Sequence, residues 1–297
     1  MVITTFPCLA SEEKRDVLPS RIKLLDEGLK NESLKNLIQF GDSLFEKEDY
    51  YNALTIYQYA LLKTKKNENL YFRIALCYQM GEQWQEAEKS FKEFLILFPH
   101  SKNAPEASFR IGQGYFNGKN YQQAIDSFKE TTKTFPNSKY SIQSEYTIGL
   151  SYAQLGNWDL SKEEFQRLAK ENPEHPFAKK ANSIAQLLDQ TGKIPRKSPW
   201  LAGFLSIVPG LGKVYTHHYF PALIALLING GLGFIIYDSF DNDREAVGAL
   251  FSVVAAATYS SNIIGGYRSA IRFNQRMNNE FSDQILREGY IPDLETQ

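Results

Sequence analysis

A repeated spacing of 37 residues constrains the fold of this chain more than any other feature of its sequence. Phe91, Phe128 and Phe165 are separated by this interval. The same interval relates other residue classes: Tyr78, Tyr115 and Tyr152; Pro99, Pro136 and Pro173; and Ala75, Gly112 and Gly149. A step of 34 residues back from this register reaches Gly41, Ala53, Tyr57 and Ala60. One period shared by several residue classes indicates a repeated supersecondary unit whose copies stack on one another.

The small and aromatic positions of each repeat resemble the pattern of tetratricopeptide repeats (TPRs) across residues 34–173. The first helix of such a repeat carries a small residue, here Gly41, Ala75, Gly112 and Gly149. The second helix carries alanine and then an aromatic residue, here Ala53, Ala87 and Ala124, followed by Tyr57, Phe91, Phe128 and Phe165. Ser161 replaces the alanine of the fourth repeat, and Lys65 replaces the terminal proline of the first. The resemblance implies an all-α solenoid of four helical hairpins at residues 34–67, 68–102, 105–138 and 142–173.

Packing explains why this pattern forms a solenoid. Small residues let the two helices of a hairpin approach closely, and the aromatic residues fill the space between neighbouring hairpins. Proline ends each second helix because it lacks an N–H and clashes with the preceding turn. Residues 175–191 are predicted to form a capping helix. With an N-terminal helix near Ile22–Leu29, the solenoid domain is expected to cover residues 18–192.

Two segments suggest where the protein works. Residues 1–17 resemble the end of a secretory signal peptide, with small residues at Cys8 and Ala10 before a charged run. No basic residue precedes the short apolar run, so an ordinary unstructured terminus is the alternative. The linkers Phe98-Pro99-His100-Ser101 and Phe135-Pro136-Asn137-Ser138 resemble those of bacterial envelope TPR proteins, namely outer-membrane assembly lipoproteins and Tol-Pal coordinators. This resemblance implies a cell-envelope setting.

TPR arrays bind extended peptides or helices on the concave face that their first helices form. Family geometry places eight candidate partner-binding residues there: Ile38, Phe45, Phe72, Leu76, Phe109, Phe116, Tyr146 and Leu150. Phe72, Phe109 and Tyr146 share one slot in consecutive repeats and are expected to form an aromatic row that anchors a partner protein. The alternative is that neighbouring side chains or the N-terminal helix cover this row.

The composition changes after the basic linker at residues 193–199. Residues 219–237 and 246–267 contain no charged side chain and are each long enough for a transmembrane helix. A buried hairpin of a soluble domain is the alternative. Small residues are expected to let the two helices pack closely, with Gly230, Gly231 and Gly233 on the first and Gly248, Ala255 and Ala256 on the second. Gly265 and Gly266 are expected to end the second membrane span. Residues 277–297 form a polar tail.

Residues 200–212 are apolar but short, and Pro209-Gly210-Leu211-Gly212 interrupts them. This segment is predicted to be a re-entrant or interfacial helix, or a third crossing. A Pro-Gly-x-Gly turn followed by Tyr215 and two spans resembles a small bacterial membrane domain found after TPR arrays, and the resemblance covers residues 196–276. The resemblance implies a multi-pass location in the inner membrane, with contacts to the lipid bilayer.

The topology follows from the charges and from the number of crossings. Arg268, Arg272 and Arg276 follow the last span, whereas the loop at residues 238–245 is acidic, so the positive-inside rule puts the C-terminal tail in the cytoplasm. Two crossings would make the repeats cytoplasmic. Three crossings, or a cleaved signal peptide, would make them periplasmic, which the Phe-Pro-x-Ser linkers favour.

No catalytic motif accompanies these features. The sequence lacks the P-loop, dinucleotide-binding, zinc-protease and serine-hydrolase motifs. Cys8 and Cys77 have no second cysteine at CxxC spacing, and no metal or cofactor is expected. A net charge of −1 argues against nucleic-acid binding, and no small-molecule substrate is evident. The sequence thus predicts a non-enzymatic, membrane-anchored TPR scaffold; the alternative is a transport or lipid-handling component whose C-terminal helices act, with Asn229 and Asn262 as its polar residues.

Overall fold

The computed structural model describes residue 29 and residues 31–64 and 66–289. The chain divides into two compact units, residues 1–185 and 186–297. The predicted signal-peptide remnant at residues 1–17 lies outside the described residues. So does the predicted N-terminal helix, apart from Leu29.

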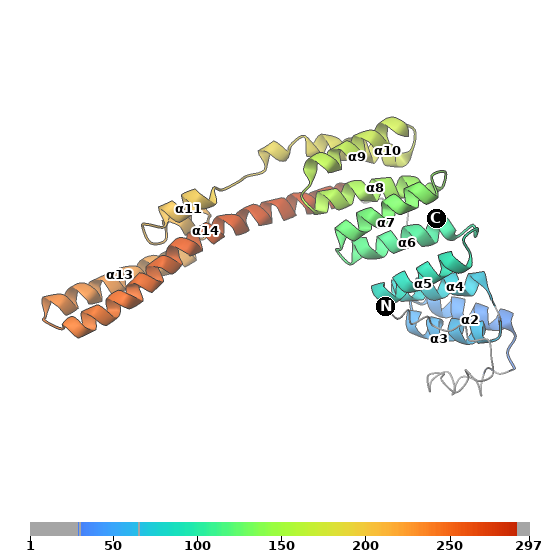
Figure 1. Ribbon diagram of the computed structural model, residues 1–297, viewed down its shortest axis with the longest axis horizontal. Helices are drawn as coiled ribbons and strands as arrows, with labels where there is room; N and C mark the ends of the chain where they lie inside the picture. The colour runs from blue at the N-terminus through green and yellow to red at the C-terminus, as the bar shows by residue number, and fades with distance from the viewer. Residues whose placement is uncertain (1–28, 30, 65, 290–297) are drawn as a thin grey trace. The chain divides into compact units, whose positions relative to one another are not determined.

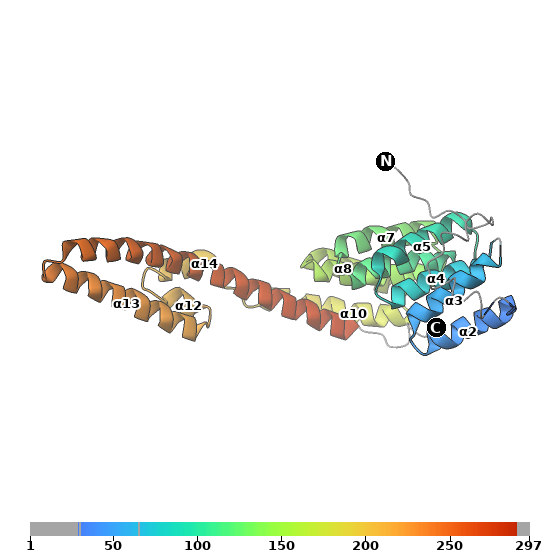
Figure 2. The same cartoon turned by 90° about the horizontal axis from the view of Figure 1, so that it is seen from below.

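The first unit consists of helical hairpins that follow one another along the chain (Figure 1). Consecutive helices also lie side by side when the molecule is turned (Figure 2). The helices are α2 (Leu34–Glu46), α3 (Tyr50–Leu62), α4 (Glu68–Met80), α5 (Trp84–Leu97), α6 (Ala104–Asn117), α7 (Tyr121–Thr134), α8 (Lys139–Gln154), α9 (Trp158–Glu171) and α10 (Pro176–Leu188).

Close contact between the two helices of a hairpin depends on the small residue of the first helix. A Cβ atom added to Gly112 would lie 2.6 Å from the Phe128 ring, and one added to Gly149 would lie 2.8 Å from the Phe165 ring. The Tyr57 ring lies equally close to Gly41. Real Cβ atoms do not approach carbon this closely, so a larger side chain would have to move the ring or the helix. The glycine and the aromatic residue are therefore two halves of one contact.

The Phe-Pro-x-Ser linkers have a local structural role. Pro99 and Pro136 follow the ends of α5 and α7, where their missing N–H groups leave no helical hydrogen bond unmade. The hydroxyl of Ser138 accepts a hydrogen bond from the backbone N–H of Ser141 at 3.2 Å, which caps the first turn of α8. Ser101 likewise accepts from the N–H of Asn103 at 2.9 Å, just before α6. The linker ends one hairpin and starts the next.

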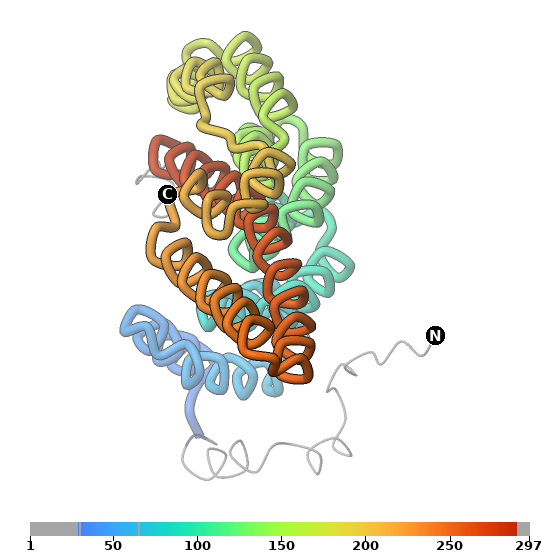
Figure 3. The backbone as a smooth tube through the Cα atoms, turned by 90° about the vertical axis from the view of Figure 1, so that its left-hand side faces the viewer, coloured from blue at the N-terminus to red at the C-terminus, as the bar shows by residue number. Residues whose placement is uncertain are grey.

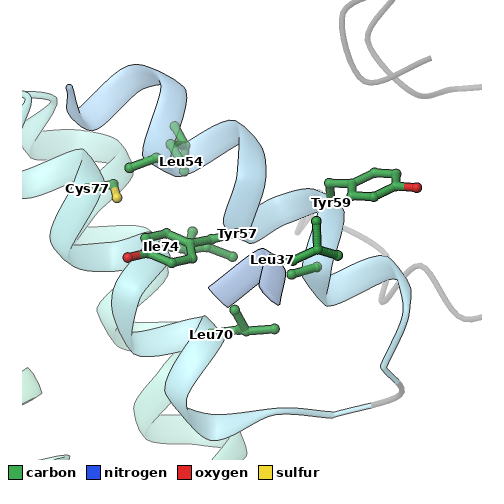
Figure 4. Packing of buried hydrophobic residues seen from close by; sticks show 9 residues of the cluster. Leu37, Leu54, Tyr57, Tyr59, Leu70, Ile74 and Cys77 are labelled. Atoms are coloured by element: carbon green, nitrogen blue, oxygen red, sulfur yellow. The ribbon is translucent and has the colours of Figure 1, made fainter. Parts of the chain in front are cut away.

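The core is divided between neighbouring hairpins. One cluster lies between α2, α3 and α4, where Leu37, Tyr57, Leu70, Ile74 and Cys77 are buried (Figure 4). Because α4 belongs to the second repeat, the first hairpin completes its core only by contact with its neighbour. Such nearest-neighbour packing is the basis of solenoid stability.

The described residues after 198 form two short and two long α-helices. The short ones are α11 (Pro199–Leu205) and α12 (Leu211–Tyr215), and the long ones are α13 (Tyr219–Asp241) and α14 (Glu245–Gly289). Helices α13 and α14 run side by side and are joined by a tight turn at residues 242–244, as Figures 2 and 3 show. The short helices α11 and α12 both pack on α14.

In this unit the last helix extends beyond the predicted second span, and one expected glycine contact was wrong. Helix α14 does not end at Gly265 and Gly266 but continues to Gly289, so residues 277–289 of the predicted polar tail are helical. The reason is that Gly266 is a contact site: a Cβ there would lie 2.8 Å from the Ala202 carbonyl oxygen of α11. The glycines at 230, 231 and 233 also do not pack against α14, since nothing lies within 4 Å of a Cβ built on them. Gly248 is the glycine that approaches the opposite helix, at Phe240.

Candidate partner-binding face and membrane hairpin

The three aromatic residues of the predicted row pack in the same way in three consecutive repeats. Each ring lies against the aromatic residue of the second helix in its own repeat. The ring centroids are separated by 5.8 Å for Phe72 and Phe91, 5.4 Å for Phe109 and Phe128, and 5.4 Å for Tyr146 and Phe165. Distances of 4.5–7 Å are those of favourable aromatic pairs. The row is therefore built into the repeat itself.

A second ring covers each member of the row. Phe72 also contacts Phe94, Phe109 contacts Tyr140 of the next repeat, and Tyr146 contacts Phe177 of α10. As a result Tyr146 is 3% exposed and Phe72 is 9% exposed. This differs from the expected open row: neighbouring side chains cover Phe72 and Tyr146, and only Phe109 remains half-buried.

The other five predicted residues lie on the same first helices with unequal exposure. Leu150 is buried on α8. Ile38, Phe45, Leu76 and Phe116 are half-buried, and each packs partly against a core cluster. Phe45 and Phe116 contact the first residues of the following helices, Tyr50 and Tyr121, with ring centroids 5.1 and 5.5 Å apart. Half-buried side chains of this kind keep some exposed surface while their packing holds them in place.

Polar residues between these apolar ones form two hydrogen-bond networks. The first is centred on Asp42. The carboxylate of Asp42 on α2 accepts a hydrogen bond of 2.6 Å from the Tyr57 hydroxyl and pairs with the Arg73 guanidinium on α4. Burial, followed by the bond to Asp42, raises the pKa of Tyr57, so its hydroxyl stays protonated and donates. The Asp42 and Arg73 side chains remain 30% and 37% exposed, respectively.

The second network is centred on Arg110, which occupies the position of Arg73 in the next repeat. Arg110 on α6 pairs with Glu106 at 3.0 Å and donates to Gln113 at 3.2 Å. The backbone carbonyl of Arg110 accepts from Gln79 at 2.9 Å, which ties α6 to α4. Arg73 and Arg110 are 37 residues apart, so the repeat spacing itself could have identified both. They were not predicted as site residues, because the sequence pattern was defined by aromatic and small residues alone.

The second unit exposes apolar surface along its two long helices. Phe220 and Phe234 on α13 are 73% and 70% exposed, and Val253 on α14 is 70% exposed. Both helices are long and apolar enough to cross a membrane, and 11% of the most apolar stretch of each is buried. The core helix of a soluble domain would be mostly buried. The exposed surface of this hairpin needs an apolar environment or partner.

The Pro-Gly-x-Gly turn fixes the short helices at one end of this hairpin. Gly210 has φ +91°, a left-handed conformation that other residues rarely adopt, and a Cβ there would lie 2.5 Å from the Ala222 carbonyl oxygen. Asn262 of α14 holds the same turn. Its Nδ2 donates to the Ser206 carbonyl at 2.8 Å and its Oδ1 accepts from the Gly210 N–H at 3.3 Å.

Two other polar residues of this unit are also engaged locally. Asn229 donates to the Ala225 carbonyl of its own helix at 2.7 Å. His218 lies between the Thr216 and Ser269 hydroxyls, each 3.2 Å from its Nδ1. In the described part of the chain no group of three or more histidine, cysteine, aspartate or glutamate residues is placed to hold a metal.

Known repeat families match the first unit. One model of the tetratricopeptide repeat matches residues 70–101 and a second matches residues 100–189. Residues 70–189 contain tetratricopeptide repeats. TPRs typically serve as protein-interaction scaffolds, and the hairpins of α2–α9 with their glycine–aromatic contacts have this form. No curated protein matches the chain.

Solved structures similar to the TPR chain have low sequence identity. RapI in its apo form is 14% identical, with 86% of this chain and 98% of that chain covered and a TM-score of 0.46. A TPR protein from Parabacteroides merdae is 17% identical, with the same coverage and a TM-score of 0.44. YrrB, described as a TPR protein with an unusual peptide-binding site, is 18% identical over 58% of this chain and 84% of that chain, with a TM-score of 0.39.

Proposed function

We propose that this chain is a membrane-anchored TPR scaffold of the bacterial inner membrane, which holds a segment of a partner protein on the first helices of its repeats. The observation that carries the proposal is the exposed apolar hairpin of α13 and α14 on the same chain as a TPR array. Lipid would cover the surface that the hairpin exposes, and the TPRs would be held at the membrane. No catalytic role is assigned to either unit.

The partner-binding face in this proposal consists of the predicted residues that keep exposed surface, together with the polar residues between them. The half-buried members are Ile38, Phe45, Leu76, Phe109 and Phe116. Arg73 and Arg110 add charge and hydrogen-bond donors along the same helices. Phe72, Tyr146 and Leu150 are given a supporting role, because their side chains fix the positions of those helices.

Crosslinking in cells tests this face. A photoreactive amino acid at Gln113 on α6 is expected to form a covalent adduct with a protein partner. The matched control is the same amino acid at Gln123, an exposed position on the second helix of the same repeat. Adducts at both positions, or at Gln123 alone, would argue that partners do not use the first helices.

Helix lengths support two crossings. Helix α11 has seven residues and would extend about 10 Å, which is too short for a hydrocarbon core of about 30 Å. With two crossings, the repeats and the basic end of the hairpin share one side, and the positive-inside rule makes that side the cytoplasm. We therefore propose cytoplasmic repeats, in place of the periplasmic location that the Phe-Pro-x-Ser linkers favoured. Those linkers are accounted for by their helix-capping role.

Cysteine labelling in intact cells decides the side. Asn137 is exposed in the turn between α7 and α8, so Asn137→Cys in a Cys8→Ser/Cys77→Ala background supplies one accessible thiol. Cytoplasmic repeats predict protection from a membrane-impermeant maleimide until the cells are permeabilised. Labelling of intact cells would instead make the repeats periplasmic.

The contacts of Asn262 and Asn229 favour an anchor over a transport component. Residues that bind a transported substrate keep polar atoms available along its path. The Nδ2 and Oδ1 atoms of the Asn262 amide both bond the α11–α12 turn, and Asn229 donates to its own helix. If Asn229→Ala, which loses only a hydrogen bond within its own helix, abolished a cellular phenotype that Arg73→Ala/Arg110→Ala left intact, the scaffold proposal would be wrong.

A further inference from the structure

The charges of the second unit are sorted between the two ends of the hairpin. Residues 193–237 contain four lysines or arginines and no acidic residue, and residues 246–279 contain three arginines and no acidic residue. The turn at the other end carries Asp238, Asp241, Asp243 and Glu245, with Arg244 paired to Asp238. One end of the hairpin therefore carries an excess of positive charge over these two segments.

Contacts within the unit bring these cations together. The backbone of Lys197 is hydrogen-bonded to Asn274, which lies between Arg272 and Arg276 on α14. The Lys197 ammonium lies 5.7 Å from the centre of the Phe273 ring, and the Arg276 guanidinium lies 5.6 Å from the same centre. Lysine and arginine stems that pack on aromatic rings hold the charge near the apolar surface while the head stays in water.

One further contact and the spacing of three arginines extend this group along α14. The Lys213 side chain reaches α14 at Gly265, where its Cε would lie 3.6 Å from an added Cβ. Arg268, Arg272 and Arg276 follow Gly265 and are spaced four residues apart, which places the three arginines along one side of the helix. We call Lys197, Lys213, Arg268, Arg272 and Arg276 the basic collar. In the described ranges no ion pair to a carboxylate is found for any of the five.

Exposed aromatic residues lie beside the basic collar. The Trp200 ring is 79% exposed and contacts Tyr267, the residue before Arg268, with centroids 5.5 Å apart. Phe204 and Tyr219 are 68% and 63% exposed. Aromatic rings of this kind prefer the level of the lipid headgroups. Cations at this level lie where headgroup phosphates are found.

We propose that the basic collar binds the phosphate headgroups of anionic phospholipids in the leaflet that surrounds this end of the hairpin. The inference rests on the proposed membrane location and adds the lipid class to it. Clusters of four to eight basic residues next to a span attract anionic lipids, and guanidinium groups match phosphate geometry with paired donors. The acidic turn at the opposite end would have no such preference.

Quenching of Trp200 by brominated lipids, measured on the full chain, tests both the membrane location of this end of the hairpin and its preference for anionic lipid. A Trp84→Phe/Trp158→Phe variant leaves Trp200 as the single tryptophan, since the sequence has three. It is reconstituted in vesicles of equal parts phosphatidylglycerol and phosphatidylcholine, with one or the other lipid brominated. Quenching by brominated phosphatidylglycerol is expected to correspond to a binding constant about fivefold above that of phosphatidylcholine. The preference should shrink in 0.5 M NaCl, because salt screens charge.

Three variants distinguish a specific collar from net charge. Arg268→Gln/Arg272→Gln/Arg276→Gln is expected to bring the ratio close to one, and the corresponding triple substitution to lysine is expected to keep it. The charge-matched control Lys102→Gln/Lys133→Gln/Lys170→Gln, at exposed positions in the TPRs, is expected to keep the full preference. Equal quenching by the two lipids, or the same loss in both glutamine variants, would overturn the inference while leaving the anchor intact. No quenching by either lipid would overturn the membrane location itself.

Discussion

The side-chain amide of Asn274 on α14 is paired with the backbone of Lys197, 77 residues earlier in the chain. Its Oδ1 accepts from the Lys197 N–H at 2.8 Å, and its Nδ2 donates to the Lys197 carbonyl at 2.9 Å. The two bonds satisfy a backbone segment that has no helix of its own. They hold the linker before α11 against the basic part of α14.

Replacing this amide should release the linker. Asn274→Ala removes both hydrogen bonds, each worth about 1 kcal/mol, and exposes the Arg196–Lys197 and Lys197–Ser198 bonds to protease. Limited trypsin digestion of the purified protein in detergent is expected to cut there several-fold faster. Asn279→Ala, at an exposed position on the same helix, serves as control and should be cut at the parental rate.

The glycine–aromatic contacts predict opposite effects for two neighbouring glycines of α6. Gly112→Ala forces a Cβ against the Phe128 ring and should cost about 1–3 kcal/mol by overpacking. Gly114→Ala meets only the Trp84 ring at an ordinary 3.9 Å and should stabilise the helix by up to about 1 kcal/mol. Thermal unfolding followed by circular dichroism measures both. Equal effects of the two substitutions would contradict the close contact at Gly112.

The buried thiol of Cys77 should be inert in the folded protein. Burial raises the pKa of Cys77 to about 12, with Arg73 lowering it and Asp42 raising it to a smaller extent. Relative to a free thiol, the reactive thiolate at pH 8 falls about a thousandfold. In a Cys8→Ser variant, a disulfide reagent should therefore label Cys77 slowly under native conditions and quickly in denaturant. Fast native labelling would show that the cluster between α2, α3 and α4 opens readily.

Loss of the Asn262 side-chain amide should destabilise the hairpin, because this amide holds the turn between α11 and α12. Asn262→Ala leaves the buried Ser206 carbonyl and Gly210 N–H without these partners, at a cost of about 2–4 kcal/mol. Asn229→Ala loses one bond within its own helix and should cost less than about 1 kcal/mol. Unfolding in mixed detergent micelles compares the two. A larger effect at Asn229 would contradict the structural role of Asn262.

The pH dependence of the TPR unit should include a contribution from Glu164 on α9. Burial raises the pKa of Glu164, and Arg167 opposes this by a smaller amount. A raised folded pKa means that the stabilising contribution is complete below the ordinary pKa and is lost as pH rises through the folded value. Glu164→Gln is therefore expected to be more stable than the parent at pH 7.5 and to approach it at pH 4. Urea unfolding at both pH values measures the difference.

The hairpins could be predicted from sequence because their signals are local and repeated. Gly112 and Phe128 lie in one repeat, and Pro136 and Ser138 end one helix and cap the next within three residues. The exposure of the aromatic row could not be predicted in this way. Phe109 is covered by Tyr140 from the next repeat and Tyr146 by Phe177 from α10, and the register of one repeat does not reveal what its neighbour contributes.

The sequence by itself determined the all-α class, the period of the TPRs and the presence of two long apolar helices. Each depends on residue spacing along a single segment, which backbone geometry converts directly into a helix face or a helix length. The tertiary structure decided the continuation of α14 through Gly265 and Gly266, the burial of Tyr146 and the pairing of Asn274 with Lys197. These depend on contacts between segments distant in sequence, and which segments meet is determined only when the whole unit packs.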